Sequence, residues 1–167
     1  NRAVPENVTP LRRPYELPKN EKWKALSSLM KIVFWKELWW VSKRKKLSKG
    51  ILNTMLISLY KAEKTKAFLN DLAEKYSKDT IYAYSYWSND NALALALWKN
   101  KQKNIKAVCR THGWDIYEER SDFNYLPYRH TIGHYFDGIY FISEQGKNYW
   151  QEKYGKGRNL SISRLGT

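Results

Sequence analysis

Between Thr80 and Ser163 the chain alternates short runs of strand composition with longer runs of helix composition. The strand-like runs are rich in Ile, Val and Tyr, and Ser, Asn or Asp stands where a following helix is expected to begin. Strands joined by helices in this order predict parallel pairing with right-handed crossovers. We therefore expect an α/β fold with an open, doubly wound parallel sheet. The expected strands are 80–87, 105–111, 137–143 and 159–163, and the expected helices are 88–102 and 144–155.

The run "ALALAL" (residues 92–97) alternates as a strand does, but it contains no β-branched residue and follows a capping position, which favours a helix. A variable region with one short helix is expected between the second and third strands. These segments together form an α/β part, residues 77–167.

The first half of the chain has a different pattern. Residues 1–20 contain four of the five prolines and predict an irregular lead-in. Residues 21–76 predict a basic, aromatic region of two helices, 21–48 and 51–76, because apolar residues recur at helical spacing. In the first helix the apolar residues at this spacing are Trp23, Leu26, Met30, Val33, Phe34 and Val41.

The composition sets limits on partners and on covalent chemistry. Apolar residues make up 43% of the chain, enough for a packed core. The 30 basic and 16 acidic residues give a net charge of +14, which implies an anionic partner: nucleic acid, an acidic membrane surface or a phosphorylated substrate. Cys109 is the only cysteine, so an intramolecular disulfide and a cysteine-based metal site are excluded.

Polar residues or a glycine follow each expected strand. Open parallel sheets bind ligands at the carboxyl ends of their strands, so these positions predict a site. His112 is able to donate or accept a hydrogen bond, and Gly113 permits close approach of a ligand. The candidate binding residues besides His112 are Trp87, Asn89, Arg110, Gly113, Asp115, Ser143, Glu144 and Arg164.

Each candidate also has an interpretation without function. His112 could make a structural hydrogen bond, and Asp115 suits a turn or a helix N-cap. Ser143 suits a plain cap, and Arg110 suits a surface salt bridge, although arginines at strand ends also fit phosphate.

Other chemistries lack their sequence patterns. His130 and His134 stand four residues apart, but no carboxylate has the spacing of a metalloprotease helix, so no metal site is expected. The chain has neither a phosphate-binding P-loop nor a GxGxxG or GxSxG motif.

The last half of the chain resembles part of a known family. The segments "SYWSNDNALALAL", "VCRTHGWDIYEER", "YLPYRHTIGHYFDGIYFISEQGKNYWQEKYG" and "LSISRLGT" are similar, in this order, to the late part of the N-terminal domain of family-four glycosyltransferases, which have the GT-B fold. Such enzymes serve bacterial polysaccharide and capsule biosynthesis. One departure is Leu165-Gly166, where many members have Asn-Gly.

The resemblance implies a Rossmann-like half of a GT-B fold with a helical basic insertion. It implies retaining transfer of a sugar from a nucleotide-sugar to a saccharide acceptor, often lipid-linked, with no essential metal and no cofactor besides the donor. His112 would lie in the cleft, near the donor sugar and the acceptor. It also implies that the first strands and the C-terminal domain lie outside this chain, so that the fragment alone is expected to be inactive.

The segment 21–49 combines tryptophans with lysine and arginine, as helices that lie on anionic membranes do. This favours a protein peripheral to a membrane. The resembling enzymes often act on lipid-linked acceptors at the cytoplasmic face, so the resemblance implies a cytoplasmic protein at the inner face of the cell membrane. No specific nucleic-acid motif is present. The alternatives are a core-packing helix with a solvated basic end, or a nucleic-acid- or membrane-binding module without catalysis. The candidate membrane-surface residues are Trp35, Trp39, Trp40, Lys43, Arg44, Lys45 and Lys46.

Overall fold

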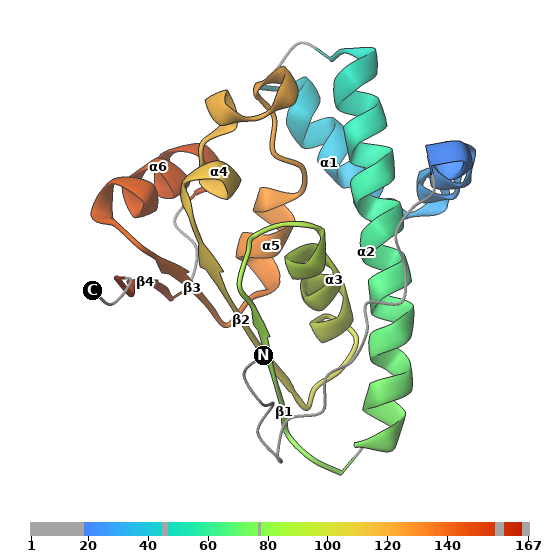
Figure 1. The fold of residues 1–167 in the computed structure, drawn as a ribbon, viewed down its shortest axis with the longest axis vertical. Coiled ribbons are helices and arrows are strands. Elements are labelled where there is room, and N and C mark those ends of the chain that lie inside the picture. The colour runs from blue at the N-terminus through green and yellow to red at the C-terminus, as the bar shows by residue number, and fades with distance from the viewer. Residues whose placement is uncertain (1–18, 45–46, 77, 156–158, 165–167) are drawn as a thin grey trace, which may run out of the picture.

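The computed structural model describes residues 19–44, 47–76, 78–155 and 159–164. Within these residues four strands form one sheet in the order β1-β2-β3-β4, and every neighbouring pair is parallel (Figure 1). The predicted parallel α/β sheet is therefore confirmed. The strands are β1 (Ile81–Ser85), β2 (Ile105–Thr111), β3 (Gly138–Phe141) and β4 (Leu160–Ile162).

Helices connect each strand to the next. The two predicted crossover helices are confirmed, with ends that differ by a few residues. The variable region between β2 and β3 folds into several short helical pieces rather than one helix. The connecting elements are α3 (Asp90–Lys99), α4 (Gly113–Ile116), η2 (Glu118–Arg120), η3 (Asp122–Asn124), α5 (Arg129–Tyr135) and α6 (Glu144–Tyr154).

The two faces of the sheet differ in burial. In β2, Ile105, Ala107 and Cys109 are buried on one face, whereas Lys106 is exposed on the other. Tyr82, which pairs with Lys106, is 81% exposed. Strands that follow one another in sequence order receive right-handed crossovers on a single face. The described helices therefore cover one face, which differs from the doubly wound arrangement expected, in which helices cover both.

Helix α3 is enclosed on nearly all sides. All seven residues from Ala92 to Trp98 are buried, because α2, α5 and the sheet surround the helix. The side chain of Asn89 caps its first turn by accepting a hydrogen bond from the backbone N–H of Asn91, over 3.0 Å. The alternating "ALALAL" run is thus a buried helix, as predicted from its capping residue.

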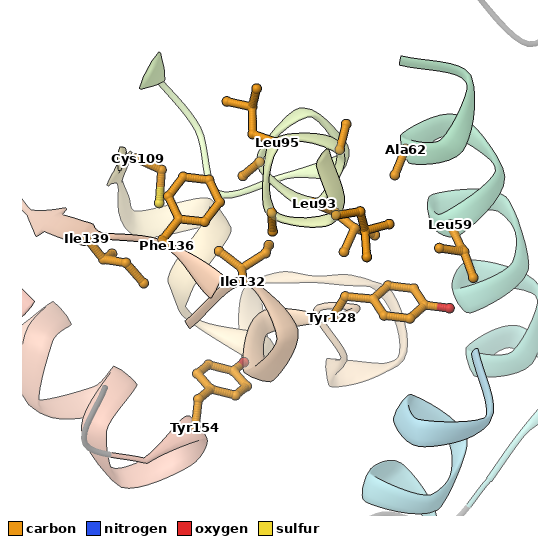
Figure 2. Close-up of a cluster of buried hydrophobic side chains, with 14 of the residues drawn as sticks. Leu59, Ala62, Leu93, Leu95, Cys109, Tyr128, Ile132, Phe136, Ile139 and Tyr154 are labelled. Carbon is orange, nitrogen blue, oxygen red and sulfur yellow. The ribbon is translucent and has the colours of Figure 1, made fainter. Parts of the chain in front are cut away.

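One cluster of buried side chains joins the first half of the chain to the sheet. It extends from α2, through α3 and α5, to β2, β3 and α6 (Figure 2). Leu59 of α2 and Leu93 of α3 both belong to it, and full burial of one such side chain stabilises the fold by about 1.5–3 kcal/mol. Helix α2 is therefore part of the same core as the sheet.

The predicted helix 21–48 is two helices. A 3₁₀ helix, η1 (Lys19–Met30), is followed by α1 (Ile32–Ser42), and Lys31 between them is extended, with φ −99° and ψ 127°. The predicted second helix is confirmed as α2 (Lys49–Lys75). No helix in the described residues is both long and apolar enough to cross a membrane.

The break at Lys31 allows two faces of the segment to be buried. Ala25 and Ser28 of η1 are each 2% exposed, and their spacing matches the three residues per turn of a 3₁₀ helix. Phe34 and Val41 of α1 are also buried. An uninterrupted α-helix, turning about 100° per residue, would direct these two pairs to opposite sides. Because Lys31 is extended, both pairs face the interior. The N-terminal members of the apolar set predicted for this helix, Trp23, Leu26 and Met30, remain exposed.

Candidate functional site

The carboxyl edge of the sheet brings several of the predicted residues together. The turns after β1, β2 and β3 lead into α3, α4 and α6, and α4 lies beside α6 (Figure 1). Gly146 in the first turn of α6 faces the side chain of Ile116 in α4; a Cβ there would lie 3.1 Å from Ile116 Cδ1. The ends of β2 and β3 are thus held close to each other.

Asp115 holds two of these turns in place. Its Oδ2 accepts a hydrogen bond from the backbone N–H of Ser88 at 2.6 Å, and its Oδ1 accepts one from the backbone N–H of His112 at 2.5 Å. The residue is fully buried, and burial raises the pKa of its carboxyl, against the effect of these two bonds. Asp115 therefore positions His112, in agreement with the turn or cap interpretation.

The imidazole of His112 lies at the end of β2 and is 7% exposed. Neither ring nitrogen makes a hydrogen bond of normal geometry within the described residues, although the ring stands at the N-cap of α4 and faces the backbone N–H of Asp115 in a capping-box arrangement. Burial, together with the charge of Arg110, lowers the pKa of His112, and Asp115 opposes this shift. The ring is therefore neutral at neutral pH, with one nitrogen able to donate and the other able to accept. A buried polar side chain without a partner costs stability, so this ring is a strong candidate to meet a ligand.

Aromatic side chains surround the imidazole. The ring centroid of Trp87 lies 4.2 Å from that of His112, and the ring centroid of Tyr86 lies 4.7 Å from it. Trp114 continues the group, 5.1 Å from Trp87. Tyr86 and Trp114 are about half exposed, so the group reaches the surface.

We name the group formed by Tyr86, Trp87, His112 and Trp114 the aromatic cluster. Trp87 and His112 were predicted as site residues from the sequence, whereas Tyr86 and Trp114 were not. Their adjacency to strand-end candidates was the available signal, since Tyr86 precedes Trp87 and Trp114 follows Gly113.

Two of the remaining candidates at the helix starts are N-caps. Asn89 caps α3, and Ser143 caps α6, where its hydroxyl accepts a hydrogen bond from the N–H of Gly146 at 3.2 Å. Glu144 is exposed in the first turn of α6. The space beside Gly113 is taken by a side chain of this chain, because a Cβ there would lie 2.6 Å from Arg120 Nη1.

The predicted arginines do not line the aromatic cluster. Arg110 donates a hydrogen bond to the hydroxyl of Ser163 at 2.5 Å, on the sheet face that the helices leave open. Arg164 is exposed after β4. The buried arginine near this edge is Arg129, whose Nε donates to the carbonyl oxygen of Asp115 at 2.9 Å. No local pattern in the sequence links residues 14 positions apart, so this contact was not predicted.

The candidate membrane residues separate into two groups. Trp35 and Trp39 are 54% and 61% exposed on α1. Trp40 points inward and stacks on Tyr154, with ring centroids 5.9 Å apart. The ammonium of Lys43 lies 3.8 Å from the ring centroid of Trp39, and the guanidinium of Arg44 lies 4.2 Å from that of Trp40. Residues 45 and 46, the predicted Lys45 and Lys46, lie outside the described residues.

The carboxyl edge therefore combines a neutral imidazole, aromatic rings and the starts of three helices. The described residues contain no group of three or more His, Cys, Asp or Glu side chains that could hold a metal ion. Comparison of the chain with family models, with curated proteins and with solved structures yields no match.

Proposed function

We propose that the aromatic cluster is the sugar-facing part of a glycosyltransferase site, in a protein that transfers a sugar from a nucleotide-sugar to a saccharide acceptor. The observation that carries the proposal is the buried imidazole of His112, which makes no hydrogen bond of normal geometry among the described residues and packs against two aromatic rings that also contact each other. A sugar ring has an apolar C–H face and polar hydroxyls, so aromatic rings beside a hydrogen-bonding group suit it. The resemblance to family-four enzymes adds to this support.

His112 has a defined role in the proposal. Its lowered pKa keeps the ring neutral, so one nitrogen can accept a hydrogen bond from a sugar hydroxyl while the other can donate one, which positions the sugar. Asp115 fixes the backbone of His112 and so fixes the point from which the ring projects. As the resemblance implies, a second domain of the GT-B type would stabilise the charge of the leaving phosphate. The nucleotide-sugar donor would be a substrate, and no cofactor is needed.

Access to His112 requires a movement. Both ring nitrogens are covered, and the rings of Tyr86 and Trp87 contact the imidazole. A sugar that reaches His112 therefore displaces one of these rings, and the fluorescence of Trp87 should change on binding.

The first prediction concerns His112→Ala in the intact protein. Removal of a group that positions a sugar hydroxyl in the transition state is expected to lower the rate of transfer by roughly 10²-fold or more, while folding stays unchanged. The measurement is release of nucleoside diphosphate from UDP-glucose, UDP-galactose, UDP-N-acetylglucosamine and GDP-mannose with a lipid extract as acceptor source. Asn148→Ala, at an exposed position on α6 outside the aromatic cluster, is the control. Undiminished turnover in His112→Ala would remove the role of this residue.

The protein in this proposal works at a membrane surface. Large apolar side chains recur at every third or fourth position along η1 and α1 and are exposed by 39–71%. Monomeric soluble proteins rarely expose a large continuous patch of this kind. The residues, which we name the apolar stripe, are Trp23, Leu26, Leu29, Ile32, Trp35 and Trp39.

The chemistry of the apolar stripe favours lipid over nucleic acid. Leu26, Leu29 and Ile32 are aliphatic and offer no ring on which a base could stack, whereas hydrocarbon tails accommodate them. Lys36 lies on the same helix as Trp35 and Trp39, Lys43 directly follows that helix, and both suit anionic headgroups. We therefore propose docking on the cytoplasmic face of an anionic membrane.

A second prediction follows for the apolar stripe. The chain is expected to co-sediment with vesicles that contain phosphatidylglycerol, and the bound fraction should fall as salt rises, because ions screen the lysines. Ile32→Ser, at a side chain 71% exposed, should reduce binding several-fold without changing stability. Asn53→Ser, an exposed position on α2, serves as control. Equal binding to vesicles of neutral phosphatidylcholine would contradict docking through charge.

A further inference from the structure

A cavity of about 540 Å³ lies between α1 and α5. Its size falls within the range of about 300–1,000 Å³ that is typical of small-molecule sites. Its walls are mainly aromatic, and they include Trp35, Trp39, Trp40, Thr131 and Tyr135. The cavity is separate from the aromatic cluster, whose residues do not line it.

The cavity opens onto the apolar stripe. Trp35 and Trp39 line the cavity and also belong to the stripe, with 54% and 61% of their surfaces exposed. A hydrocarbon surface that covers the stripe therefore lies at the mouth of the cavity. A single chain from that surface could enter without crossing water.

Positive charge is concentrated near the cavity. Lys36 lines it, Lys43 lies over the ring of Trp39, and Arg44 lies over the ring of Trp40. Within the described residues neither Lys36 nor Lys43 makes an ion pair with a carboxylate. These cations are placed to meet an anionic group at the surface.

The other titratable groups that face the cavity do not oppose an anion strongly. Glu37 lines it, but its carboxyl accepts hydrogen bonds from Tyr125 and Tyr128 and is 3% exposed. Burial raises the pKa of Glu37 to about 7, which lessens its negative charge near neutral pH. His130 and His134 face the cavity from α5.

We propose that this cavity takes one hydrocarbon chain of an anionic phospholipid, drawn from the bilayer on which the apolar stripe docks. The aromatic walls contact the chain, and Lys36, Lys43 and Arg44 contact the phosphate. The inference rests on the membrane docking proposed above and adds to it a specific lipid site. A bound lipid would hold the carboxyl edge of the sheet at a fixed distance from the membrane.

The test uses a phospholipid that dissolves as monomers. The 167-residue chain is titrated calorimetrically with dihexanoyl-phosphatidylglycerol below the concentration at which it aggregates. We expect saturable binding of one lipid per chain. Dihexanoyl-phosphatidylcholine should bind at least tenfold more weakly because its headgroup has no net charge, and glycerophosphoglycerol should not bind because it lacks the chains.

Two variants separate the cavity from the stripe. Thr131→Trp fills the cavity and should weaken dihexanoyl-phosphatidylglycerol binding at least tenfold, whereas Thr65→Trp on α2, also half-buried, should not. Ile32→Ser should weaken vesicle binding several-fold yet keep the affinity for the monomeric lipid, since Ile32 does not line the cavity. Failure of docking and failure of the lipid site are thus distinguished.

The outcomes that overturn the proposal are specific. Unchanged lipid binding in Thr131→Trp, or equal affinity for the two headgroups, would sink it. Absence of lipid binding, together with a dimer that Thr131→Trp abolishes, would assign the cavity to a second copy of the chain. His134→Trp, from a different position of the cavity wall, replaces Thr131→Trp if near-ultraviolet circular dichroism reveals that the latter is unfolded.

Discussion

Asp115→Ala is expected to lower the free energy of unfolding by about 2–6 kcal/mol, because it leaves two buried N–H groups without an acceptor, at about 1–3 kcal/mol each. The two groups are the backbone amides of Ser88 and His112, which lie 2.6 Å and 2.5 Å from the carboxylate oxygens. Urea unfolding, followed by tryptophan fluorescence, measures the change.

Asp115→Asn keeps the shape of the side chain but removes one of its two acceptor oxygens. The amide keeps one acceptor oxygen but directs an NH₂ group at the second backbone N–H, so a loss of about 1–3 kcal/mol is expected. Glu152→Ala, which removes an exposed carboxylate on α6, should stay within about 0.5 kcal/mol of the parent chain. A loss below about 1 kcal/mol in Asp115→Ala would mean that this carboxylate does not hold the two turns together.

The other large effect is expected at Glu37. A single oxygen, Oε1, accepts both the hydroxyl of Tyr125 and the backbone N–H of Tyr128, each at 2.8 Å. Glutamine retains such an oxygen, so Glu37→Gln keeps both hydrogen bonds while it removes the charge. Burial is the largest cause that raises the pKa of Glu37, from 4.5 to about 7.

The sign of the pH effect follows from this shift. Between pH 4.5 and about 7 the folded chain holds a proton on Glu37 that the unfolded chain has lost. The contribution of the Glu37 proton to the free energy of unfolding is therefore fully present below pH 4.5, declines as pH rises, and is lost above about pH 7. The loss amounts to about 3 kcal/mol. Glu37→Gln should match the parent chain at pH 4 and exceed its stability by up to this amount at pH 8.

The measurement for Glu37 is the difference in urea midpoint between the two chains at a series of pH values. Groups that titrate equally in the two chains contribute the same pH dependence to both midpoints, so their contribution cancels in the difference. Glu74→Gln, at an exposed position on α2, should give a difference near zero at every pH. A constant difference between the parent and Glu37→Gln across the range would contradict a raised pKa.

Much of the second half of the chain was predictable because its determinants are local. Strand β2 has the bounds expected from its β-branched residues, Ile105–Thr111. Asn89 and Ser143 were expected to cap helices and do so, since a cap depends on residues two or three positions away. The alternation of strands and helices then required parallel pairing.

The candidate site was predictable only in part. The position of His112 at a strand end followed from strand order, and the resemblance singled out the same residue. That its ring makes no hydrogen bond of normal geometry among the described residues, and that Tyr86 and Trp114 join it, required the folded chain. Arg110 was expected at a phosphate but bonds Ser163, because alternation along the strand turns it to the open face of the sheet.

By itself the sequence determined the parallel α/β sheet, the order of its elements and which polar residues end its strands, since periodicity and capping act over a few residues. Only the tertiary structure decided which sheet face is covered, where the first helix breaks, and which polar groups are satisfied inside. The reason is that burial depends on partners far along the chain. Glu37 accepts hydrogen bonds from Tyr125 and Tyr128, which lie 88 and 91 positions further along the chain. Asp115 accepts one from the backbone N–H of Ser88, 27 positions before it.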